Sequence, residues 1–199
     1  MPTDKKILLN LDYWLTDEHT GVHNAPKTRI ILSDTYMQGM NHIQRLKLSK
    51  SMVFPHYTVD KQGVLYQHAP PERISHLMDC VGYEHFIHIA LENLNWLKYS
   101  FKDGQDVYTN TFGIHGRPRN TFEYEYRTYR FWDTYSTKQI TGLKRLIKHV
   151  AQQQGLQPKV FNRPSVIENL MDFKTYEVIG RANLDSSFTD PAPKFYDYF

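Results

Sequence analysis

Short apolar runs along the chain predict buried β-strands. One run of β-branched side chains spans residues 29–32, and a second apolar run spans 86–91. In the second run, a period of two places His88, Ala90 and Glu92 on one face and the aliphatic side chains on the other. Weaker patterns of the same kind predict a last strand over residues 176–180 and a strand or extended arm over 5–15.

A β-hairpin is predicted in the first half of the chain. Residues 56–59 and 64–67 are strand-like and flank a polar turn, 60–63, that ends in glycine. A polar segment before it, residues 16–28, predicts a loop, and apolar spacing over 40–48 predicts a short helix.

The strongest helical pattern follows in the second half. Residues 136–154 carry apolar side chains at helical spacing, and Ser136 and Gln139 have the spacing of a capping box. Gly155 predicts the helix end, and a second, short helix is expected within 165–173. Strands that alternate with helices predict an α/β fold, with a central mixed β-sheet flanked by helices.

Aromatic residues are the compositional outlier, at 14% of the chain. They gather in residues 98–135, where little periodicity is visible, and in the last five residues. Tyrosine, tryptophan and arginine dominate interface hot spots, so both stretches are candidate partner surfaces; the alternative is that each packs on the domain itself. The candidate surface residues are Tyr124, Tyr126, Arg127, Tyr129, Arg130, Trp132, Phe195, Tyr196, Tyr198 and Phe199.

The overall charge and the single cysteine narrow the class of protein. The 199 residues carry a formal net charge of +3, which is too mild to indicate nucleic-acid or membrane-surface binding. No apolar run approaches the roughly 20 residues that cross a bilayer. With one cysteine and no secretory signal pattern at the N-terminus, the chain is expected to be made in a reducing cytoplasm.

Four segments resemble, in order, the zinc-dependent N-acetylmuramoyl-L-alanine amidases, which share their fold with peptidoglycan recognition proteins. They are residues 29–35, 56–67, 87–93 (Ile-His-Ile-Ala-Leu-Glu-Asn) and 179–193, which contains Thr-Asp-Pro-Ala-Pro. The resemblance divides the chain into an N-terminal arm or extra strand (1–27), an amidase-like domain (28–195) with the aromatic insertion at 98–135, and a C-terminal tail (196–199).

The resemblance implies a zinc site whose ligands are largely replaced in this chain. The family holds zinc with two histidines and an aspartate or cysteine, uses a glutamate as general base, and has a lysine nearby. Serine is a poor zinc ligand, arginine cannot ligate a metal, and alanine cannot move a proton. The corresponding residues here are Ser33 and Arg181 for the histidines, Ala90 for the glutamate, Ser187 or Phe188 for the lysine, and Asp190 for the retained ligand.

We therefore expect no zinc and no other cofactor, and an ion pair between Arg181 and Asp190 in the position of the metal. Two alternatives stay open. Arg181 could point to solvent while Asp190 caps a turn, or a relocated metal site could use His88 and Asp190.

The expected function is that of a catalytically inactive amidase-fold protein with a structural or binding role. By analogy with compact amidases encoded by bacteriophages, it is a candidate virion component of a tail or baseplate, with protein partners in a larger assembly. One alternative is a peptidoglycan-binding module whose groove includes Tyr57, His76 and His88. The other is an active zinc N-acetylmuramoyl-L-alanine amidase.

Overall fold

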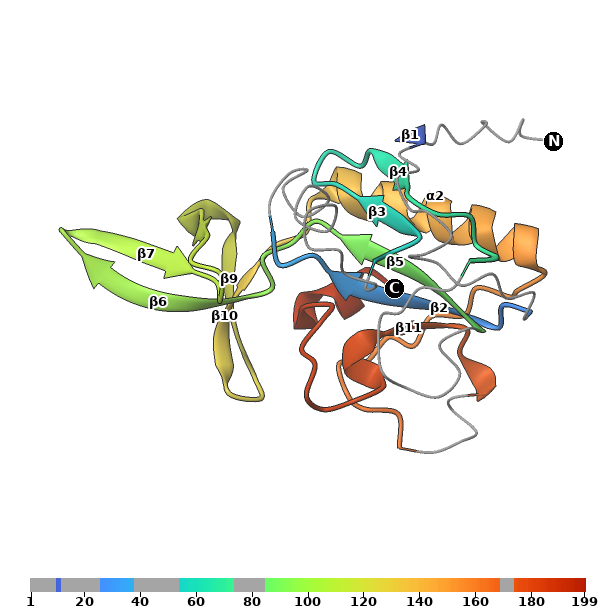
Figure 1. Ribbon diagram of the computed structural model, residues 1–199. Coiled ribbons are helices and arrows are strands. Elements are labelled where there is room, and N and C mark those ends of the chain that lie inside the picture. The colour runs from blue at the N-terminus through green and yellow to red at the C-terminus, as the bar shows by residue number, and fades with distance from the viewer. Residues whose placement is uncertain (1–9, 12–25, 38–53, 74–84, 169–173) are drawn as a thin grey trace.

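The computed structural model describes residues 10–11, 26–37, 54–73, 85–168 and 174–199 (Figure 1). Two β-sheets and one long helix organise these residues. The larger sheet and the helix form the body, and the smaller sheet projects from one end of it (Figure 1). In this part of the chain, no helix has the length and apolar character needed to cross a membrane.

The larger sheet has six strands in the order β1-β4-β3-β5-β2-β11. β2 pairs in parallel with β5 and with β11, and β3 pairs with β4 as an antiparallel hairpin. This mixed sheet, with a helix against it, confirms the predicted α/β class. Its strands are β1 (Asn10–Leu11), β2 (Arg29–Asp34), β3 (Tyr57–Val59), β4 (Leu65–Gln67), β5 (Phe86–Leu91) and β11 (Val178–Gly180).

The two faces of the central strands have different roles. On β5, the side chains of Ile87, Ile89 and Leu91 enter the main core, as the period of two predicts. His88 and Ala90 lie on the opposite face and are also buried. Because both faces are buried, the strand shows a continuous apolar run rather than a clean alternation.

The helix α2 (Thr137–Gln154) supplies the other side of the main core. Ser136 caps it, because its Oγ accepts a hydrogen bond from the backbone N–H of Gln139 at 3.0 Å, and Gly155 ends it in the left-handed conformation. The side chain of Gln139 does not complete a capping box; its Nε2 donates to the carbonyls of Val59 and Glu92 instead. Gln139 thus ties the helix to the sheet.

Residues 96–133 form a second sheet of five strands, in the order β8-β7-β6-β10-β9. The sequence predicted no strands in this insertion, because little periodicity is visible there. Many of its side chains are exposed on both faces of the sheet, so no alternation of apolar and polar residues marks the strands. The strands are β6 (Trp96–Lys102), β7 (Gln105–Thr109), β8 (His115–Gly116), β9 (Thr121–Tyr126) and β10 (Tyr129–Asp133), with a 3-10 turn, η2, at Pro118–Asn120.

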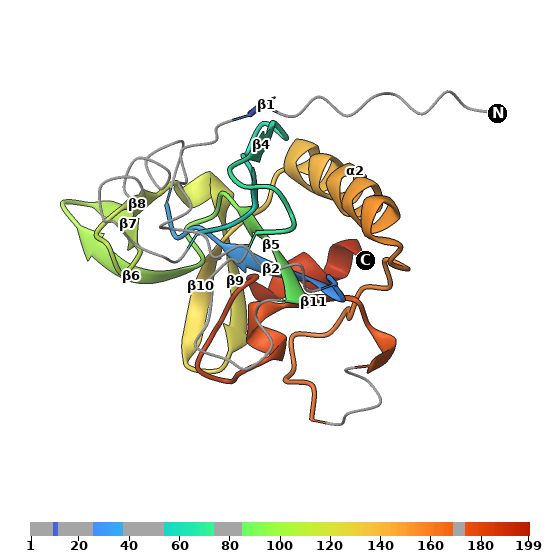
Figure 2. The same cartoon turned by 45° about the vertical axis from the view of Figure 1, so that its right-hand side comes forward.

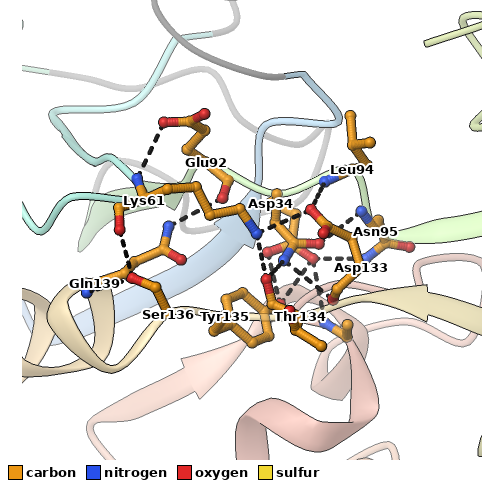
Figure 3. A network of polar contacts seen from close by, with 12 residues as sticks. Asp34, Lys61, Glu92, Leu94, Asn95, Asp133, Thr134, Tyr135, Ser136 and Gln139 are labelled. Atoms are coloured by element: carbon orange, nitrogen blue, oxygen red, sulfur yellow. Dashed lines mark hydrogen bonds and ion pairs between the residues drawn. The ribbon is translucent and has the colours of Figure 1, made fainter. Parts of the chain in front are cut away.

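A buried polar network joins the second sheet to the body (Figure 3). Lys61, in the β3–β4 turn, forms an ion pair with Asp133 at 2.9 Å, and Asp133 accepts a hydrogen bond from the backbone N–H of Leu94. The side chain of Asn93 donates to the carbonyls of Asp133 and Thr134. The root of the insertion is therefore held by charged and amide groups as well as by apolar packing.

The C-terminal residues fold back onto the body as a 3-10 helix, η4 (Pro193–Tyr198), which lies beside the large sheet (Figure 2). Phe195 and Tyr196 are 1% and 5% exposed and belong to the main core, and Tyr198 and Phe199 pack against it. Phe195 and Tyr196 therefore dock on their own domain, which is the alternative that the sequence left open, and they are not surface residues. For the half-buried Tyr198 and Phe199, the role at a partner surface stays a prediction.

Candidate functional site

The residues that the resemblance singled out come together at one end of the large sheet. Ser33 on β2 is the register partner of Ala90 on β5, and Gly180, the last residue of β11, leads directly into Arg181. Since these strands are parallel, their carboxyl ends meet at one edge, where ligand sites of open α/β sheets commonly lie. Gly180 is required there, because a Cβ would come within 2.5 Å of Tyr196 Oη.

An Arg181–Asp190 ion pair lies at this edge, as predicted. Arg181 donates from Nε at 3.0 Å and from Nη2 at 2.9 Å, and both bonds reach the same oxygen, Asp190 Oδ1. The pair is well removed from water, because the side chains of Arg181 and Asp190 are 14% and 0% exposed. Burial lowers the pKa of Arg181, but the negative charge of Asp190 and the hydrogen bonds to Asp190 and Tyr36 together outweigh it, so the net shift of this pKa is upward.

Further contacts hold the pair in place. The second oxygen of Asp190, Oδ2, accepts a hydrogen bond from the backbone N–H of Asp34 at 3.0 Å. Tyr36 donates its hydroxyl to Asp190 Oδ1 at 3.3 Å, and the guanidinium carbon of Arg181 lies 4.4 Å from the ring centre of Phe188. Both oxygens of Asp190 therefore accept hydrogen bonds within the chain, and an aromatic ring covers the cation.

A second buried carboxylate, Asp34, lies next to the pair. It accepts hydrogen bonds from the hydroxyl of Tyr135 at 2.8 Å and from Asn95 Nδ2 at 2.7 Å (Figure 3). The backbone N–H of Ala192 also donates to it, at 3.2 Å. Burial, together with the negative charge of Asp190, raises the pKa of Asp34 to about 7.

Hydrogen bonds connect Ser33 to two buried histidines, His88 and His56. Ser33 Oγ lies 2.6 Å from His88 Nε2, and the backbone N–H of His88 donates to His56 Nδ1 at 3.0 Å. Burial, assisted by the positive charge of Arg181, holds the pKa of His88 well below its usual value, and burial lowers the pKa of His56 to about 3. Both rings are therefore neutral at pH 7 and act as hydrogen-bonding groups of the interior.

Two of the three predicted groove residues, Tyr57 and His88, are buried. Tyr57 is 1% exposed and lies in the main core, and His88 is 3% exposed, so both side chains are covered by the chain itself. The prediction that they contact a ligand stays a prediction. His76, with the 40–48 helix and much of the 165–173 helix, lies outside the described residues. Residues 165–168, the described part of that last segment, form no helix.

The candidate partner surface in the insertion divides into buried and exposed members. Trp132 is fully buried, so its assignment to a surface was wrong, and Tyr126 and Tyr129 pack half-buried against the core. Arg127 is exposed, but it donates hydrogen bonds to the backbone carbonyls of Ala182, Ser186 and Phe188 in its own chain. Tyr124 and Arg130 are exposed, and their role at a partner surface stays a prediction.

The donor set at this edge of the sheet does not fit a zinc ion. A catalytic zinc needs three protein ligands with lone pairs and an open fourth position. Here a guanidinium cation stands 2.9 Å from the carboxylate that would bind the metal, and Ser33 is already hydrogen-bonded to His88. Among the described residues, no three His, Cys, Asp or Glu side chains gather as a metal site.

Comparison with known families decides the identity of the fold. A family model described as N-acetylmuramoyl-L-alanine amidase matches residues 14–193. The chain belongs to this amidase family. No curated protein matches it in sequence.

Solved structures of this amidase fold superimpose on nearly the whole chain at low sequence identity. The amidase LysC from Clostridium intestinale URNW is 11% identical, with a TM-score of 0.55 over 97% of this chain and 95% of its own. The Ph2119 endolysin from Thermus scotoductus MAT2119 bacteriophage Ph2119 is 13% identical, with a TM-score of 0.51 over 92% and 91%. Staphylococcus aureus AmiA, solved with its ligand, is 15% identical, with a TM-score of 0.52 over 88% and 66%. At these identities, the likeness establishes the fold alone.

Sequence reasoning missed several polar residues around the ion pair of this amidase-family chain. Asp34 and Tyr36 contribute from one segment and Asn95 from another, and the Asp34–Asn95 hydrogen bond joins residues 61 positions apart. A usable signal was present in Asp34, because a charged residue at the end of an otherwise buried strand needs partners. The partners of Asp34 could not be predicted, because residues near 190 reach it only in the folded chain.

Proposed function

We propose that this protein is a non-catalytic member of the amidase family, in which the Arg181–Asp190 ion pair replaces the catalytic metal. The role that remains is binding or structure within a larger protein assembly. The observation that carries the proposal is the position of the Arg181 guanidinium, 2.9 Å from Asp190. An arginine remains protonated at any physiological pH, so this position holds a permanent positive charge of the chain's own.

The neighbouring residues support the same interpretation. Metal-dependent amide hydrolysis needs an activated water and a group that accepts its proton. Ala90, at the position where the family resemblance expects the general base, has no ionisable group and is 3% exposed. His88, two positions before Ala90 on the same face of β5, already shares a hydrogen bond with Ser33.

The setting of this role is a proposal by analogy. The fold is shared with a bacteriophage endolysin, and an amidase scaffold without its chemistry suits a virion component such as a tail or baseplate protein. Peptidoglycan is the competing ligand, because the family acts on the cell wall. A pulldown on purified peptidoglycan, compared with a search for stable protein partners in intact particles, separates these two roles.

The central experiment measures metal content and hydrolysis together. The purified chain is incubated with zinc, desalted and analysed for bound metal, and its release of muropeptides from purified peptidoglycan is measured. We expect less than 0.1 zinc per chain (about one tenth of a catalytic site's stoichiometry) and no release above a protein-free blank. Stoichiometric zinc with zinc-dependent release would overturn the proposal and favour an active amidase.

A gain-of-metal variant tests the assignment of positions. The triple variant Ser33→His, Ala90→Glu and Arg181→His supplies the ligands and base that the family resemblance implies, with Asp190 retained. We expect it to bind zinc, while the matched double variant Ser33→His and Ala90→Glu, which keeps Arg181, does not. A folded triple variant that binds no zinc would show that the positions are misassigned.

A further inference from the structure

The outer part of the second sheet is a two-stranded ribbon, here called the β6–β7 ribbon, that leaves the body on its own (Figures 1 and 2). β10 pairs with β6 only at Trp96 and Leu97. From Lys98 to Lys102, β6 pairs with β7 and with no other strand of the described residues. The opposite edge of this segment therefore presents backbone groups that are exposed to solvent.

The turn at the tip determines which backbone groups face outward. Asp103 and Gly104 both have positive φ, 50° and 79°, which is the conformation of a two-residue type I′ turn. In such a turn the flanking residues, Lys102 and Gln105, bond to each other. Because bonded and non-bonded pairs alternate along an antiparallel ladder, the N–H and C=O groups of Tyr99 and Phe101 point away from β7.

The same alternation explains where β10 attaches. Leu97 is the next residue of the outward-facing set, and it is paired with Phe131 of β10. β10 then departs from this line, with an irregularity between Tyr129 and Phe131. Tyr99 and Phe101 therefore lie on the same edge of β6 as Leu97, but β10 pairs with this edge only at Trp96 and Leu97.

The side chains along this edge separate two kinds of surface. Tyr99 and Phe101 share one face and are 42% and 68% exposed. The ring centre of Tyr99 lies 5.4 Å from that of Tyr108 and 5.5 Å from that of Phe131, so Tyr99 is packed against other aromatic rings on this face. Lys98 and Lys102 are exposed on the other face, so the edge is aromatic on one side and positively charged on the other.

We propose that the free edge of β6 binds an extended segment of a partner protein by strand addition. That segment carries acidic residues opposite Lys98 and Lys102 and apolar residues beside Tyr99 and Phe101, with its backbone bonded to those two aromatic residues. This inference rests on the binding role proposed above and names the kind of partner that fulfils it.

Two other occupants fit the edge less well. A second copy of the chain, paired antiparallel about Ser100, would place Lys98 directly opposite Lys102 twice, and like charges in that position are destabilising. A glycan strand could cover the aromatic rings, but it lacks the alternating amide donors and acceptors that match the backbone of Tyr99 and Phe101. An acidic polypeptide satisfies the backbone groups and both lysines together.

The test uses the full chain, labelled with ¹⁵N, and a capped synthetic peptide centred on Glu-Val-Thr-Val-Glu. Residues 98–102 have cationic and aromatic side chains in the same order in either direction (Lys, aromatic, Ser, aromatic, Lys), so the peptide fits in parallel or antiparallel orientation. At saturation we expect hydrogen exchange at the amides of Tyr99 and Phe101 to slow by at least about tenfold, with much smaller changes on α2. A peptide with lysine in place of both glutamates should produce no protection.

A charge-reversal variant makes the test specific to the edge. Lys98→Glu with Lys102→Glu should weaken binding of the glutamate peptide by at least about tenfold and create a preference for the lysine peptide. The matched control, Lys138→Glu with Lys174→Glu, makes the same charge change at exposed positions elsewhere and should leave the affinity within about twofold.

Several results would overturn the proposal. The first is no protection from hydrogen exchange at Tyr99 and Phe101, and the second is equal binding of both peptides. The third is that no peptide binds, while the Lys98→Glu, Lys102→Glu variant no longer binds insoluble peptidoglycan and the wild type does. The last result would assign the ribbon to the glycan. Zinc-dependent muropeptide release would overturn the proposed function, but it would not affect the exchange measurement, so the two failures are distinguishable.

Discussion

Two arginine–carboxylate ion pairs, one beside the large sheet and one on the second sheet, have the same chemistry but different exposure to water. Arg181 and Asp190 lie at the edge of the large sheet, with side chains 14% and 0% exposed. Arg130 and Glu123 lie on the second sheet, with side chains 60% and 55% exposed. Water screens the second pair and can solvate either partner alone, whereas removal of Arg181 would leave Asp190 charged in the interior. The body therefore depends on its internal charge pair, whereas the pair on β9 and β10 can be separated at little cost.

The largest difference is expected from removing each arginine in turn. Arg181→Ala should lower the free energy of unfolding by about 3–5 kcal/mol, because it leaves the buried Asp190 without its cation. Arg130→Ala should lower it by less than about 1 kcal/mol. Urea unfolding of both variants and the wild type measures this contrast. Equal losses would mean that burial does not distinguish the two pairs.

A pH series sharpens the comparison within the body. The pKa of Asp34 is raised to about 7 in the folded protein, above its ordinary value of 3.8, so its protonated form favours folding. The stability it contributes is present below about pH 4 and is lost as the pH rises through about 7. Asp34→Asn should remove this loss, so that its stability relative to the wild type improves by on the order of 3 kcal/mol between pH 4 and pH 7.

The measurement is the difference between two stability curves, obtained by urea unfolding at several pH values. Other groups titrate in the same range. The pKa of His56 and of His88 is lowered by burial, so their contribution is present above pH 6.5 and is lost as the pH falls. Both histidines remain in the variant and cancel in the difference. Parallel curves for the wild type and Asp34→Asn would contradict the raised pKa of Asp34.

The junction between the two regions offers an intermediate effect. Lys61→Met should cost about 2 kcal/mol of stability, because Asp133, whose side chain is 4% exposed, loses its cation and the root of the second sheet loosens. The more exposed side chain of Lys61, at 20%, keeps this effect below that of Arg181→Ala. Hydrogen exchange should speed up more in β10 than in β2. Uniform acceleration across both sheets would show that they unfold as one unit.

The smallest effect is expected at the tip of the ribbon. Phe101→Ala should change the free energy of unfolding by less than about 0.5 kcal/mol, because the ring is 68% exposed and little apolar surface is lost from the interior. Thermal and urea unfolding measure it, with Tyr124→Ala, at 48% exposed, as the matched control. A loss above about 1.5 kcal/mol would mean that the ring is part of the folded core and unavailable to a partner.

Much of the body could be predicted from local patterns, because local physics determines them. The cap at Ser136, the glycine after the helix, and the alternation on β5 depend on residues within a few positions of each other. The ion pair between Arg181 and Asp190 could also be predicted, because the two residues lie nine positions apart in a segment that resembles the final loop of the amidase family.

The second sheet could not be predicted in the same way. Its strands are exposed on both sides over much of their length, so burial imposed no pattern on their residues. The fate of individual aromatic residues was equally hidden: Trp132 and Phe195 are core residues, while Phe101 is exposed, and all three are aromatic in aromatic-rich segments. Residue type indicates the capacity for packing or binding, and the neighbours that arrive in space decide between them.

From the residues alone one can predict most of the strands and the long helix of the body, the α/β class and the family likeness. The replacement of the zinc ligands by Ser33 and Arg181 is what that likeness implies, and it stays a proposal. Tertiary structure decided that the guanidinium meets Asp190, that Asp34 is buried beside it, and that one edge of β6 stays open. The physical reason is distance along the chain. Local propensities act over a few residues, whereas burial, charge pairing and strand edges depend on segments such as 34 and 190, which only the folded sheet brings together.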